Sequence, residues 1–400
     1  MSASEIVTLG CRLNMAESER IAAILNGSAD KTVVVNSCAV TQEAVRQTRR
    51  AIRRLRRSHP DARLLVTGCA ADIEGEQIAA MPEVDGLVAN AAKLEPRAWS
   101  AGDAPRLAPQ PAARARTRAF VPVQNGCDHS CTFCVIPQGR GASRSLPVDD
   151  IVRIVADHLD QGAPEIVLTG VDVTSWGHDL PDAPALGVLV RALLDACPGL
   201  ARLRLSSIDG AEIDPLLEDM AAHEPRFMPH LHLSLQSGDD MILKRMKRRH
   251  SRADAIRLVE RLKNRRPELA VGADLIAGFP TETDDMHANN LSIISACDIV
   301  HGHVFPFSPR PGTPAARMPQ VDPVRVKARA AEMRGAVAVQ RRQWLDGLVG
   351  STQTVLAERD GTGHAENFAP VRLPAGMAQG ETARLRITER DEGLLVGEAA

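Results

Sequence analysis

The chain has 400 residues, a formal net charge of −2 and 44% hydrophobic residues, enough for two or three domains with packed cores. This charge excludes a uniformly basic nucleic-acid-binding protein, although a local basic face is still possible. No apolar run reaches membrane-spanning length, and Met1 leads into Ser-Ala-Ser-Glu rather than a signal sequence, so we expect a cytoplasmic protein that is not associated with a membrane.

Three short apolar runs in the first hundred residues predict buried strands, and helical stretches at 15–26 and 41–58 separate them. The runs lie at 5–9, 31–35 and 63–67. This alternation is typical of an α/β domain with a parallel sheet. Each run is followed by a cysteine, namely Cys11, Cys38 and Cys69, and the ends of parallel strands share one edge of the sheet. We therefore expect these thiols to converge as metal ligands, the alternative being that they are small buried apolar residues.

The predicted helix at 41–58 is crowded with arginine, and no acidic residue occurs between 45 and 60. Clustered cations gain affinity for phosphate by releasing counterions, so this face is a candidate RNA-binding surface. The candidates are Arg46, Arg49, Arg50, Arg53, Arg54 and Arg57. Two further basic groups are Lys244, Arg245, Lys247, Arg248 and Arg249, and Arg114, Arg116 and Arg118. For each group the alternative is a solvated face or internal ion pairs.

Residues 101–118 are rich in Pro and Ala and lack apolar periodicity, which predicts a linker. We divide the chain on this basis into an N-terminal domain at 1–100, a linker at 101–118, a central domain at 119–348 and a C-terminal domain at 349–400.

The run at 126–137 contains Cys127, Cys131 and Cys134 with the spacing C-x3-C-x2-C. Three thiolates can hold three irons of a [4Fe–4S] cluster and leave the fourth iron open to a small molecule, whereas four thiolates are usual. Zinc is the alternative, but zinc sites usually pair two Cys-x2–4-Cys motifs, and no second pair follows. Cys197 and Cys297 show no such pattern and are expected to be packing residues.

Six strands are predicted in the central domain, too few for a closed eight-stranded barrel but fitting an open (β/α)6 barrel. They lie at 120–124, 165–168, 202–205, 230–235, 271–276 and 301–305. Polar residues at the mouth of such a barrel are candidate ligand contacts, although each could equally cap a turn. The candidates are Thr169, Gly170, Ser206, Ser207, Gln236 and Asp274. The twelve histidines show no ligand-like spacing, and we expect them to be structural residues or to lie at the surface.

The character of the chain changes after a predicted helix at 324–348. Four short strand-like runs separated by Gly-containing turns predict a small antiparallel β-barrel. These runs lie at 352–356, 369–373, 382–387 and 394–396.

The cysteine run at 126–137 resembles the radical-SAM superfamily, in which Phe133 fills a position often taken by an aromatic residue. The tail, with Glu-Asn-Phe-Ala-Pro-Val at 366–371, resembles the RNA-binding TRAM domain. Together the three parts resemble the methylthiotransferases over essentially the whole chain, and the stretches at 8–14 and 34–41 resemble the MtaB branch. The chain departs from the family where Phe133 and Phe307 replace Tyr and where Thr281 interrupts Pro-Gly-Glu.

The resemblance implies a radical-SAM enzyme that adds a methylthio group to C2 of N6-threonylcarbamoyladenosine at position 37 of tRNA. It implies two [4Fe–4S] clusters, one on Cys11, Cys38 and Cys69 and one on Cys127, Cys131 and Cys134, together with S-adenosylmethionine (SAM). Phe133 and the polar residues of the barrel mouth are then candidates for binding SAM. The implied partners are the anticodon loop of tRNA and a low-potential electron donor such as flavodoxin or ferredoxin.

Sibling branches act on isopentenyladenosine in tRNA or on an aspartate of a ribosomal protein, and both remain alternatives. A third class is a non-catalytic RNA-binding protein with a structural metal. The threonylcarbamoyl group ends in a carboxylate, which needs a cation if it is desolvated. Arg310, Arg140 and Arg144 are the candidates by position.

Overall fold

The computed structural model describes residues 4–26, 31–99 and 117–399, which fall into two compact units. The first unit combines Met1–Ala115, Asn125–Arg144 and Ser308–Ala316, and the second combines Arg116–Gln124, Ser145–Phe307 and Arg317–Ala400. Most of the predicted linker lies outside the described residues, and its last residue, Arg118, begins a strand. Within the described ranges, no helix is long and apolar enough to cross a membrane.

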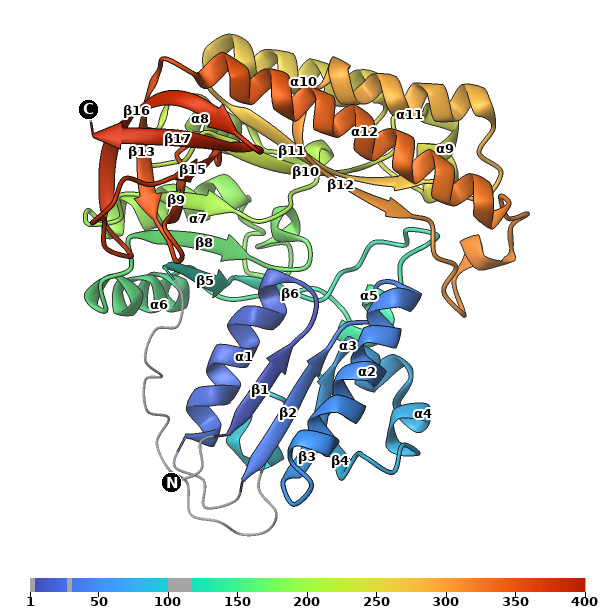
Figure 1. The fold of residues 1–400 in the computed structure, drawn as a ribbon. Helices are drawn as coiled ribbons and strands as arrows, with labels where there is room; N and C mark the ends of the chain where they lie inside the picture. Colours follow the sequence, from blue (N-terminus) through green and yellow to red (C-terminus); the bar gives the residue numbers. More distant parts are fainter. Residues whose placement is uncertain (1–3, 27–30, 100–116, 400) are drawn as a thin grey trace. The chain divides into compact units, whose positions relative to one another are not determined.

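The first unit contains the expected parallel sheet, with the strand order β1-β2-β3-β4 (Figure 1). Its strands are β1 (Glu5–Thr8), β2 (Thr32–Ser37), β3 (Arg63–Gly68) and β4 (Gly86–Leu87). The helices of the unit are α1 (Arg12–Leu25), α2 (Gln42–Ser58), α3 (Cys69–Ile73), α4 (Gly75–Ala79), η1 (Pro96–Trp99) and α5 (Ile136–Arg140).

Helices cover both faces of this sheet. Alternate residues of β2 point to opposite faces, and each set packs against a different helix. Val33 and Val35 belong to the apolar core that includes Ile52 of α2, whereas Val34 belongs to the core that includes Ile21 of α1. A strand buried on both faces must be apolar along its whole length, which is why Val33, Val34 and Val35 stand in succession.

The second unit contains six parallel barrel strands in two three-stranded sheets, β5-β8-β9 and β10-β11-β12. An isolated parallel bridge between Ile208 and Leu233 connects the two sheets. The strands are β5 (Arg118–Pro122), β8 (Glu165–Thr169), β9 (Leu203–Leu205), β10 (His230–Gln236), β11 (Ala270–Ala277) and β12 (Ile299–Pro306). This arrangement confirms the open (β/α)6 barrel.

Helices pack around the outside of these strands and share one large apolar core with them (Figure 1). They are α6 (Val148–Asp160), α7 (Leu186–Ala196), α8 (Pro215–His223), α9 (Asp240–Met246), α10 (Arg252–Arg265), α11 (Asp284–Ala296) and α12 (Pro323–Leu348). Short elements at the loops are β6 (Gln124–Asn125), β7 (Arg144–Ser145), η2 (Val173–Ser175), η3 (Gly210–Glu212) and η4 (Pro314–Arg317).

The C-terminal segment forms a closed five-stranded barrel, β13-β14-β15-β17-β16. Its strands are β13 (Thr352–Ala357), β14 (Thr362–Ala365), β15 (Pro370–Arg372), β16 (Thr382–Asp391) and β17 (Leu394–Ala399). The pattern of the sequence predicted turn residues where β14 lies, because this strand of four residues contains a glycine. A side chain at Gly363 would lie 2.4 Å from the carbonyl oxygen of Leu356, so glycine is needed for the strands to approach. One pair, β15 and β17, is parallel rather than antiparallel.

A buried ionic cluster joins the C-terminal barrel to the first strands of the (β/α)6 barrel. Glu165 is fully buried, and its carboxylate accepts hydrogen bonds from Arg118 at 2.5 Å, Arg202 at 2.9 Å and Arg204 at 2.8 Å. Arg204 also donates to the backbone carbonyl groups of Glu366 and Ala365, at 2.8 and 3.1 Å. Arg118, predicted as part of a basic run, is therefore a structural residue.

Candidate active site

The loop that carries Cys127, Cys131 and Cys134 belongs to the first unit and is closed by its own backbone. The amide of Cys127 donates to the carbonyl oxygen of Gly141 at 3.1 Å, so the two ends of the loop meet. At Gly126 the dihedral φ is +78°, and a Cβ atom would lie only 1.9 Å from the carbonyl oxygen of Ala142. Glycine is the residue that permits this approach.

Backbone hydrogen bonds also hold this loop, and one of them reaches a sulfur atom. The amide of Ile136, the first residue of α5, donates to Sγ of Cys134 at 3.4 Å, and the amide of Cys134 donates to the carbonyl oxygen of Cys131 at 3.2 Å. The amide of Ala315 donates to the carbonyl oxygen of Thr132 at 2.9 Å, so the segment 308–316 supports the loop. All three cysteines and Phe133 are half-buried. Amide donors to cluster sulfurs are one of the factors that set a cluster's potential.

The other three cysteines follow the ends of β1, β2 and β3, as the sequence predicted. Cys11 precedes α1, and Cys69 begins α3. Gly10 has φ of +99°, and a Cβ there would lie 2.8 Å from Cβ of Cys38, so Cys38 occupies the space above Gly10. The pKa of the Cys38 thiol is raised to about 11, mainly by burial and also by the neighbouring Cys69 and Cys11, against the opposing effects of a backbone hydrogen bond at Val40 and the charge of Arg140. The three thiols therefore converge at one edge of the sheet.

Helix α5, which follows the Cys127 loop, packs inside the first unit on α3, which begins at Cys69. Gly139 of α5 lies against Cys69, since a Cβ at Gly139 would be 3.4 Å from both Cα and Cβ of that cysteine. Asn90 reinforces the contact, because its Nδ2 donates to the carbonyl oxygen of Gly139 at 2.5 Å. Its Oδ1 is buried and makes no hydrogen bond within the described part of the chain. The same holds for Oδ1 of Asn36 and Oγ1 of Thr67, near the ends of β2 and β3.

Two buried cations and one buried carboxylate lie beside these cysteines. Glu17 accepts from Arg140 at 2.9 Å and from Lys93 at 2.5 Å, and Arg140 also donates to Oδ1 of Asn14 at 2.5 Å. Burial lowers the pKa of Arg140, but Glu17 and then Cys69 outweigh it, so the pKa lies above its usual value. The cluster carries one positive charge more than negative charges, which suits anionic thiolates nearby. The sequence suggested Arg140 as a cation for the substrate carboxylate. That suggestion is not supported, because Glu17 and Asn14 already bind its guanidinium group.

The cysteine geometry does not suit a single zinc ion. Tetrahedral zinc with Zn–S of about 2.3 Å requires sulfur atoms about 3.8 Å apart. Across the described ranges, neither cysteine triplet is among the groups of three His, Cys, Asp or Glu ligand atoms that lie within 4.8 Å of one another. The sulfur atoms of each triplet are therefore too far apart for one zinc ion to bind all three.

The candidate SAM contacts of the barrel lie in the second unit. Thr169 ends β8, and the position that a side chain of Gly170 would take is filled by Gln124, whose Oε1 would be 2.9 Å from that Cβ. Gln124 Oε1 also accepts from the amides of Val171 and Asp172, at 3.1 and 2.9 Å. Glycine is therefore required here for packing against Gln124, and not only for the approach of a ligand.

Ser206, Ser207 and Gln236 follow or end the next strands. Oγ of Ser206 is buried and makes no hydrogen bond with the residues that the structure describes, as expected for a group that faces a ligand. Ser207 is half-buried. Gln236 ends β10 with φ of +67°, an uncommon conformation for a non-glycine residue that is typical of functional positions.

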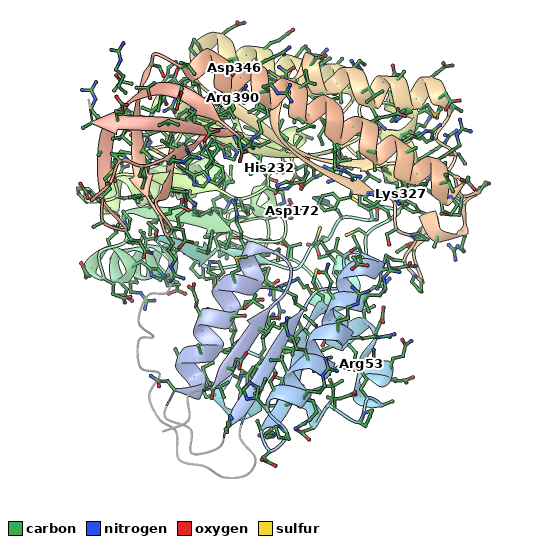
Figure 2. All side chains as sticks on the ribbon, in the orientation of Figure 1. Arg53, Asp172, His232, Lys327, Asp346 and Arg390 are labelled. Atoms are coloured by element: carbon green, nitrogen blue, oxygen red, sulfur yellow. The ribbon has the colours of Figure 1, made fainter. Side chains whose placement is uncertain are left out.

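Asp274 lies on β11 between two histidines that sequence reasoning had assigned no role. Its Oδ1 accepts from Nε2 of His232 on β10 at 3.0 Å and from Nδ1 of His303 on β12 at 3.1 Å (His232 is labelled in Figure 2). Burial raises the pKa of Asp274, but the hydrogen bonds from the two imidazoles outweigh it, so the pKa lies below the usual range. The sequence carried a signal for this group, since His230 and His232, and likewise His301 and His303, alternate with period two along predicted strands.

Helix α2 presents part of its arginine set to solvent and uses the rest internally. Arg49 pairs with Glu74 at 2.9 Å, and Arg56, which is half-buried, donates to the carbonyl oxygens of Glu83 and Ala62. The remaining arginines of the helix have exposed side chains. These are Arg46, Arg50, Arg53 (labelled in Figure 2), Arg54 and Arg57.

The other basic groups serve mainly internal contacts. Arg248 and Arg249 both pair with Asp209 at 3.0 Å, and Arg245 donates to the carbonyl oxygen of Thr281 at 3.4 Å. Lys244 and Lys247 are exposed. Arg114 and Arg116 lie outside the described residues.

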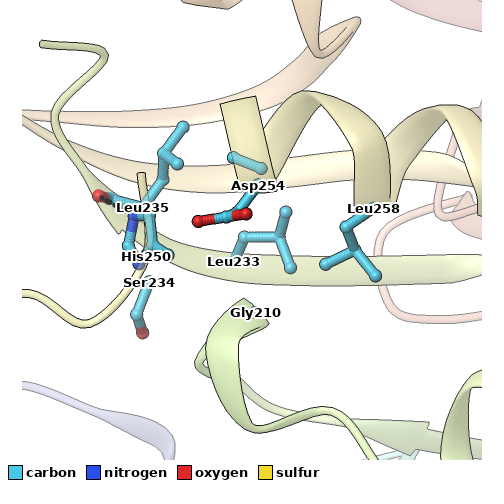
Figure 3. Close-up of a pocket in the computed structure, with 8 residues that line it drawn as sticks. Gly210, Leu233, Ser234, Leu235, His250, Asp254 and Leu258 are labelled. Atoms are coloured by element: carbon cyan, nitrogen blue, oxygen red, sulfur yellow. Dashed lines mark hydrogen bonds between the residues drawn. The ribbon is translucent and has the colours of Figure 1, made fainter. Parts of the chain in front are cut away.

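Two cavities lie near these groups. One of about 300 Å³ in the first unit is lined by Gln42, Ile73, Glu74, Gln77, Gln138, Arg310 and Pro311. Arg310 is buried there and pairs with Glu74 at 3.0 Å, so its charge already has a partner, whereas Arg144 is exposed. The other, of about 20 Å³, lies between β10 and α10 (Figure 3) and holds no more than a water molecule.

Two family models match the chain, one over each cysteine triplet. The radical SAM superfamily matches residues 121–291, and the uncharacterized protein family UPF0004 matches residues 4–89. The first covers the Cys127 loop and most of the barrel, and the second covers the three cysteines of the parallel sheet. Membership of the radical SAM superfamily implies that SAM and a [4Fe–4S] cluster are cofactors.

Similar proteins extend the match to nearly the full length. A protein of Rickettsia prowazekii named threonylcarbamoyladenosine tRNA methylthiotransferase MtaB is 43% identical, with 98% of this chain and 96% of the relative aligned. A Paracoccus denitrificans protein named tRNA-2-methylthio-N(6)-dimethylallyladenosine synthase is 34% identical over the same shares. The radical SAM methyltransferase TsrM of Kitasatospora setae shares the fold, with a TM-score of 0.51, 15% identity, and 76% of this chain and 67% of that one covered. The chain belongs to the family of radical-SAM tRNA methylthiotransferases.

Proposed function

We propose that this enzyme adds a methylthio group to C2 of N6-threonylcarbamoyladenosine at position 37 of tRNA. The higher identity to the relative named for threonylcarbamoyladenosine, 43% against 34% for the relative named for dimethylallyladenosine, supports this substrate. The signature around Cys11 and Cys38 supports the same branch. The observation that carries the proposal is the placement of all six ligand cysteines in one compact unit, with α5 packed against Cys69.

Each cysteine triplet holds a cluster in this proposal. Cys127, Cys131 and Cys134 hold the cluster that binds SAM, and Cys11, Cys38 and Cys69 hold the cluster that carries sulfur. When bound, an iron–sulfur cluster with an open iron supplies the electron for SAM cleavage and a place for the transferred sulfur. The protein positions the reactants, while the cofactors carry the chemistry.

The chain's own residues have separate tasks around these sites. Arg140 and Lys93 supply buried positive charge beside Cys11, Cys38 and Cys69, which stabilises thiolates there. The amide of Ile136 and the closed loop at Gly126 orient the second triplet. Phe133, Thr169, Gly170, Ser206, Ser207, Gln236 and Asp274 are the residues we assign to SAM.

Binding of tRNA is assigned to two surfaces. The exposed arginines of α2 meet phosphates, whereas Arg49, the sixth candidate on this helix, already pairs with Glu74, and the C-terminal barrel acts as a TRAM-like RNA-binding domain. A target base in an anticodon loop is accessible because the loop is single-stranded. We also propose three domains, at 1–100, 119–348 and 349–400. The proposed source of electrons is a low-potential donor such as flavodoxin or ferredoxin.

The test compares the two substrates that the relatives name. Reconstituted enzyme receives SAM, a reductant and one of two tRNAs, which carry either the threonylcarbamoyl or the isopentenyl modification at position 37. Mass spectrometry of the nucleosides should detect the 2-methylthio product from the first tRNA. Preference for the second would assign the chain to the other branch, and product from neither would contradict the proposal.

A further inference from the structure

The inner face of the last three barrel strands can be identified from their packing. A side chain at Gly302 would meet Cγ2 of Val337 in α12 at 2.5 Å, so position 302 faces the outer helices. Its neighbours His301 and His303 therefore point to the other face of the strand, although the last turns of α12 also reach His301 through Arg341 and Trp344. The same argument applies to β10. Leu231 and Leu233 belong to the apolar core between the strands and the surrounding helices, and His232, which alternates with them, points to the other face.

Asp274 holds the imidazole rings of His232 and His303 in place. It bridges His232 and His303 through one oxygen, and Asp274 and His303 are direct neighbours in the pairing of β11 with β12. The ring of His232 occupies the space above Gly272, where a Cβ would lie 2.3 Å from Nδ1. Since Nδ1 of His303 is committed to Asp274, Nε2 on the far side of the ring is the atom available to a ligand.

The two pairs of histidines differ in exposure. His301 and His230 are buried, with Phe368 and Trp344 packed against His301, and Arg341 lies 3.0 Å from Nδ1 of His301. In contrast, the side chain of His303 is 62% exposed. Phe305, two residues further along the same face, is 39% exposed, and its ring centroid lies 6.4 Å from that of His303.

We propose that His303 and Phe305 form the subsite for the target nucleoside, in which Phe305 stacks on the adenine and the imidazolium form of His303 donates from Nε2 to the carboxylate of the N6 substituent. Exposed aromatic side chains are the usual platforms for unstacked bases of single-stranded RNA. Asp274 and His232 position His303. The inference rests on the proposed function and deepens it, because it names the residue that reads the acidic substituent.

The charges of the subsite favour an acidic substituent over an apolar one. Two imidazoles share the single carboxylate of Asp274, so His303 can pair with a second carboxylate that the ligand supplies. A hydrogen bond to a charged group supports about a 10- to 100-fold preference. An isopentenyl group offers His303 no acceptor, and it would leave a polar group facing an apolar chain.

The experiment compares two short anticodon stem–loop RNAs that differ in one group. One carries N6-threonylcarbamoyladenosine, and the other carries its methyl ester, in which the carboxylate charge is removed. We expect the wild-type enzyme to favour the acid about tenfold or more in kcat/KM. In His303→Ala that ratio should fall to near one.

Two further variants separate recognition from folding. His303→Asn keeps a donor to Asp274 but lacks the outward nitrogen, so it should lose the preference for the acid in the same way. Phe305→Leu should raise KM for both RNAs about tenfold, because stacking does not distinguish them. The matched control is His223→Ala, which removes an exposed histidine on α8 that also pairs with an aspartate, Asp219 at 2.9 Å. It should retain the wild-type preference.

The outcomes are distinguishable from a failure of the proposed function. Wild-type enzyme that makes no methylthio product from the acid contradicts the proposed substrate. Wild-type enzyme that makes it, while His303→Asn keeps the tenfold preference, overturns the inference alone. Equal use of acid and ester by the wild-type enzyme also overturns it.

Discussion

Gly126 combines a backbone conformation and a close contact that no other residue can satisfy. Its φ of +78° alone would cost a side chain about 1–2 kcal/mol. The 1.9 Å separation between a Cβ and the carbonyl oxygen of Ala142 adds a clash with backbone that cannot move aside while the loop stays closed. Gly141 has a similar φ of +73° but nothing within 4 Å of its Cβ position.

These two glycines allow strain to be separated from the clash. Gly126→Ala should open the loop and prevent the Cys127 cluster from assembling, so iron per protein should fall to about half and 5′-deoxyadenosine formation should stop. Gly141→Ala should cost only the backbone strain, about 1–2 kcal/mol, and retain its iron. Iron and sulfide analysis after anaerobic reconstitution checks both. Equal iron in the two variants would contradict this account of the loop.

Arg140 neutralises Glu17 in the interior, and both side chains are almost fully buried. Arg140→Gln removes the hydrogen bonds that Arg140 donates to the side chains of Glu17, Asn14 and Asn125. Removing one partner of such a buried network costs about 3–5 kcal/mol. The free energy of unfolding should fall by that amount in urea denaturation.

The control for this change is Arg144→Gln, an exposed position on the same loop segment. It should alter the free energy of unfolding by less than about 0.5 kcal/mol. A similar small effect in Arg140→Gln would mean that the buried charges are solvated or rearranged in solution.

At the scale of elements, α2 has two kinds of arginine, which the sequence could not separate. The pattern of the helix showed a long basic stretch without acids, but Glu74, Glu83 and Asp85 come from elsewhere in the fold. Arg56 closes the loop that follows the helix, whereas Arg50, Arg54 and Arg57 are exposed. RNA affinity should therefore depend on the exposed set.

Replacing Arg50, Arg53, Arg54 and Arg57 with Gln should weaken binding of all tRNAs alike. The slope of log affinity against log salt should become shallower by about 0.7–0.9 for each phosphate that these side chains no longer neutralise. Arg56→Gln should instead lower stability and leave the slope unchanged. Fluorescence anisotropy at several salt concentrations measures the slope. An unchanged slope in the quadruple variant would mean that these arginines are solvated and do not bind phosphates.

The carboxylate of Glu165 binds three arginines at the junction of the two barrels, where Arg118 also pairs with Glu358 of the C-terminal segment. Burial raises the pKa of Glu165, but Arg204, Arg118 and Arg202 outweigh it, so the folded-state pKa lies far below the usual 4.5. A carboxyl with a depressed pKa contributes stability above the unfolded-state value and loses it as the pH falls toward the folded-state value. The junction should thus be at full strength near neutral pH and weaken below about pH 4.5.

Glu165→Gln should lower the free energy of unfolding at neutral pH by about 3–5 kcal/mol, because Arg202 and Arg204, both buried, lose their counter-charge. Its stability should also depend less on pH below about 4.5 than that of the wild type. Glu218→Gln is the control, since Glu218 pairs with Arg261 and Arg265 at the surface, where such pairs contribute about 0–1 kcal/mol. Equal losses in the two variants would contradict a special role for the junction.

For the whole molecule, the sequence predicted the fold class and the meeting of Cys11, Cys38 and Cys69, because strand ends and periodicity are local signals. It could not predict which cations are already paired. Arg310 and Arg140 stand at positions suited to a substrate, yet Glu74 and Glu17 reach them through tertiary packing. The inner face of the barrel was missed for the same reason: single histidines on separate strands become a group only when β10, β11 and β12 align.

The central claim is that one chain joins SAM cleavage to sulfur insertion through two cysteine triplets. The most direct test is Cys38→Ala, assayed for both products after reconstitution with SAM, a reductant and tRNA that carries N6-threonylcarbamoyladenosine. We predict that 5′-deoxyadenosine is still formed at the Cys127 cluster, while mass spectrometry detects no 2-methylthio nucleoside. Normal amounts of methylthio product from this variant would contradict the account, because sulfur transfer would then not require the cysteines of the parallel sheet.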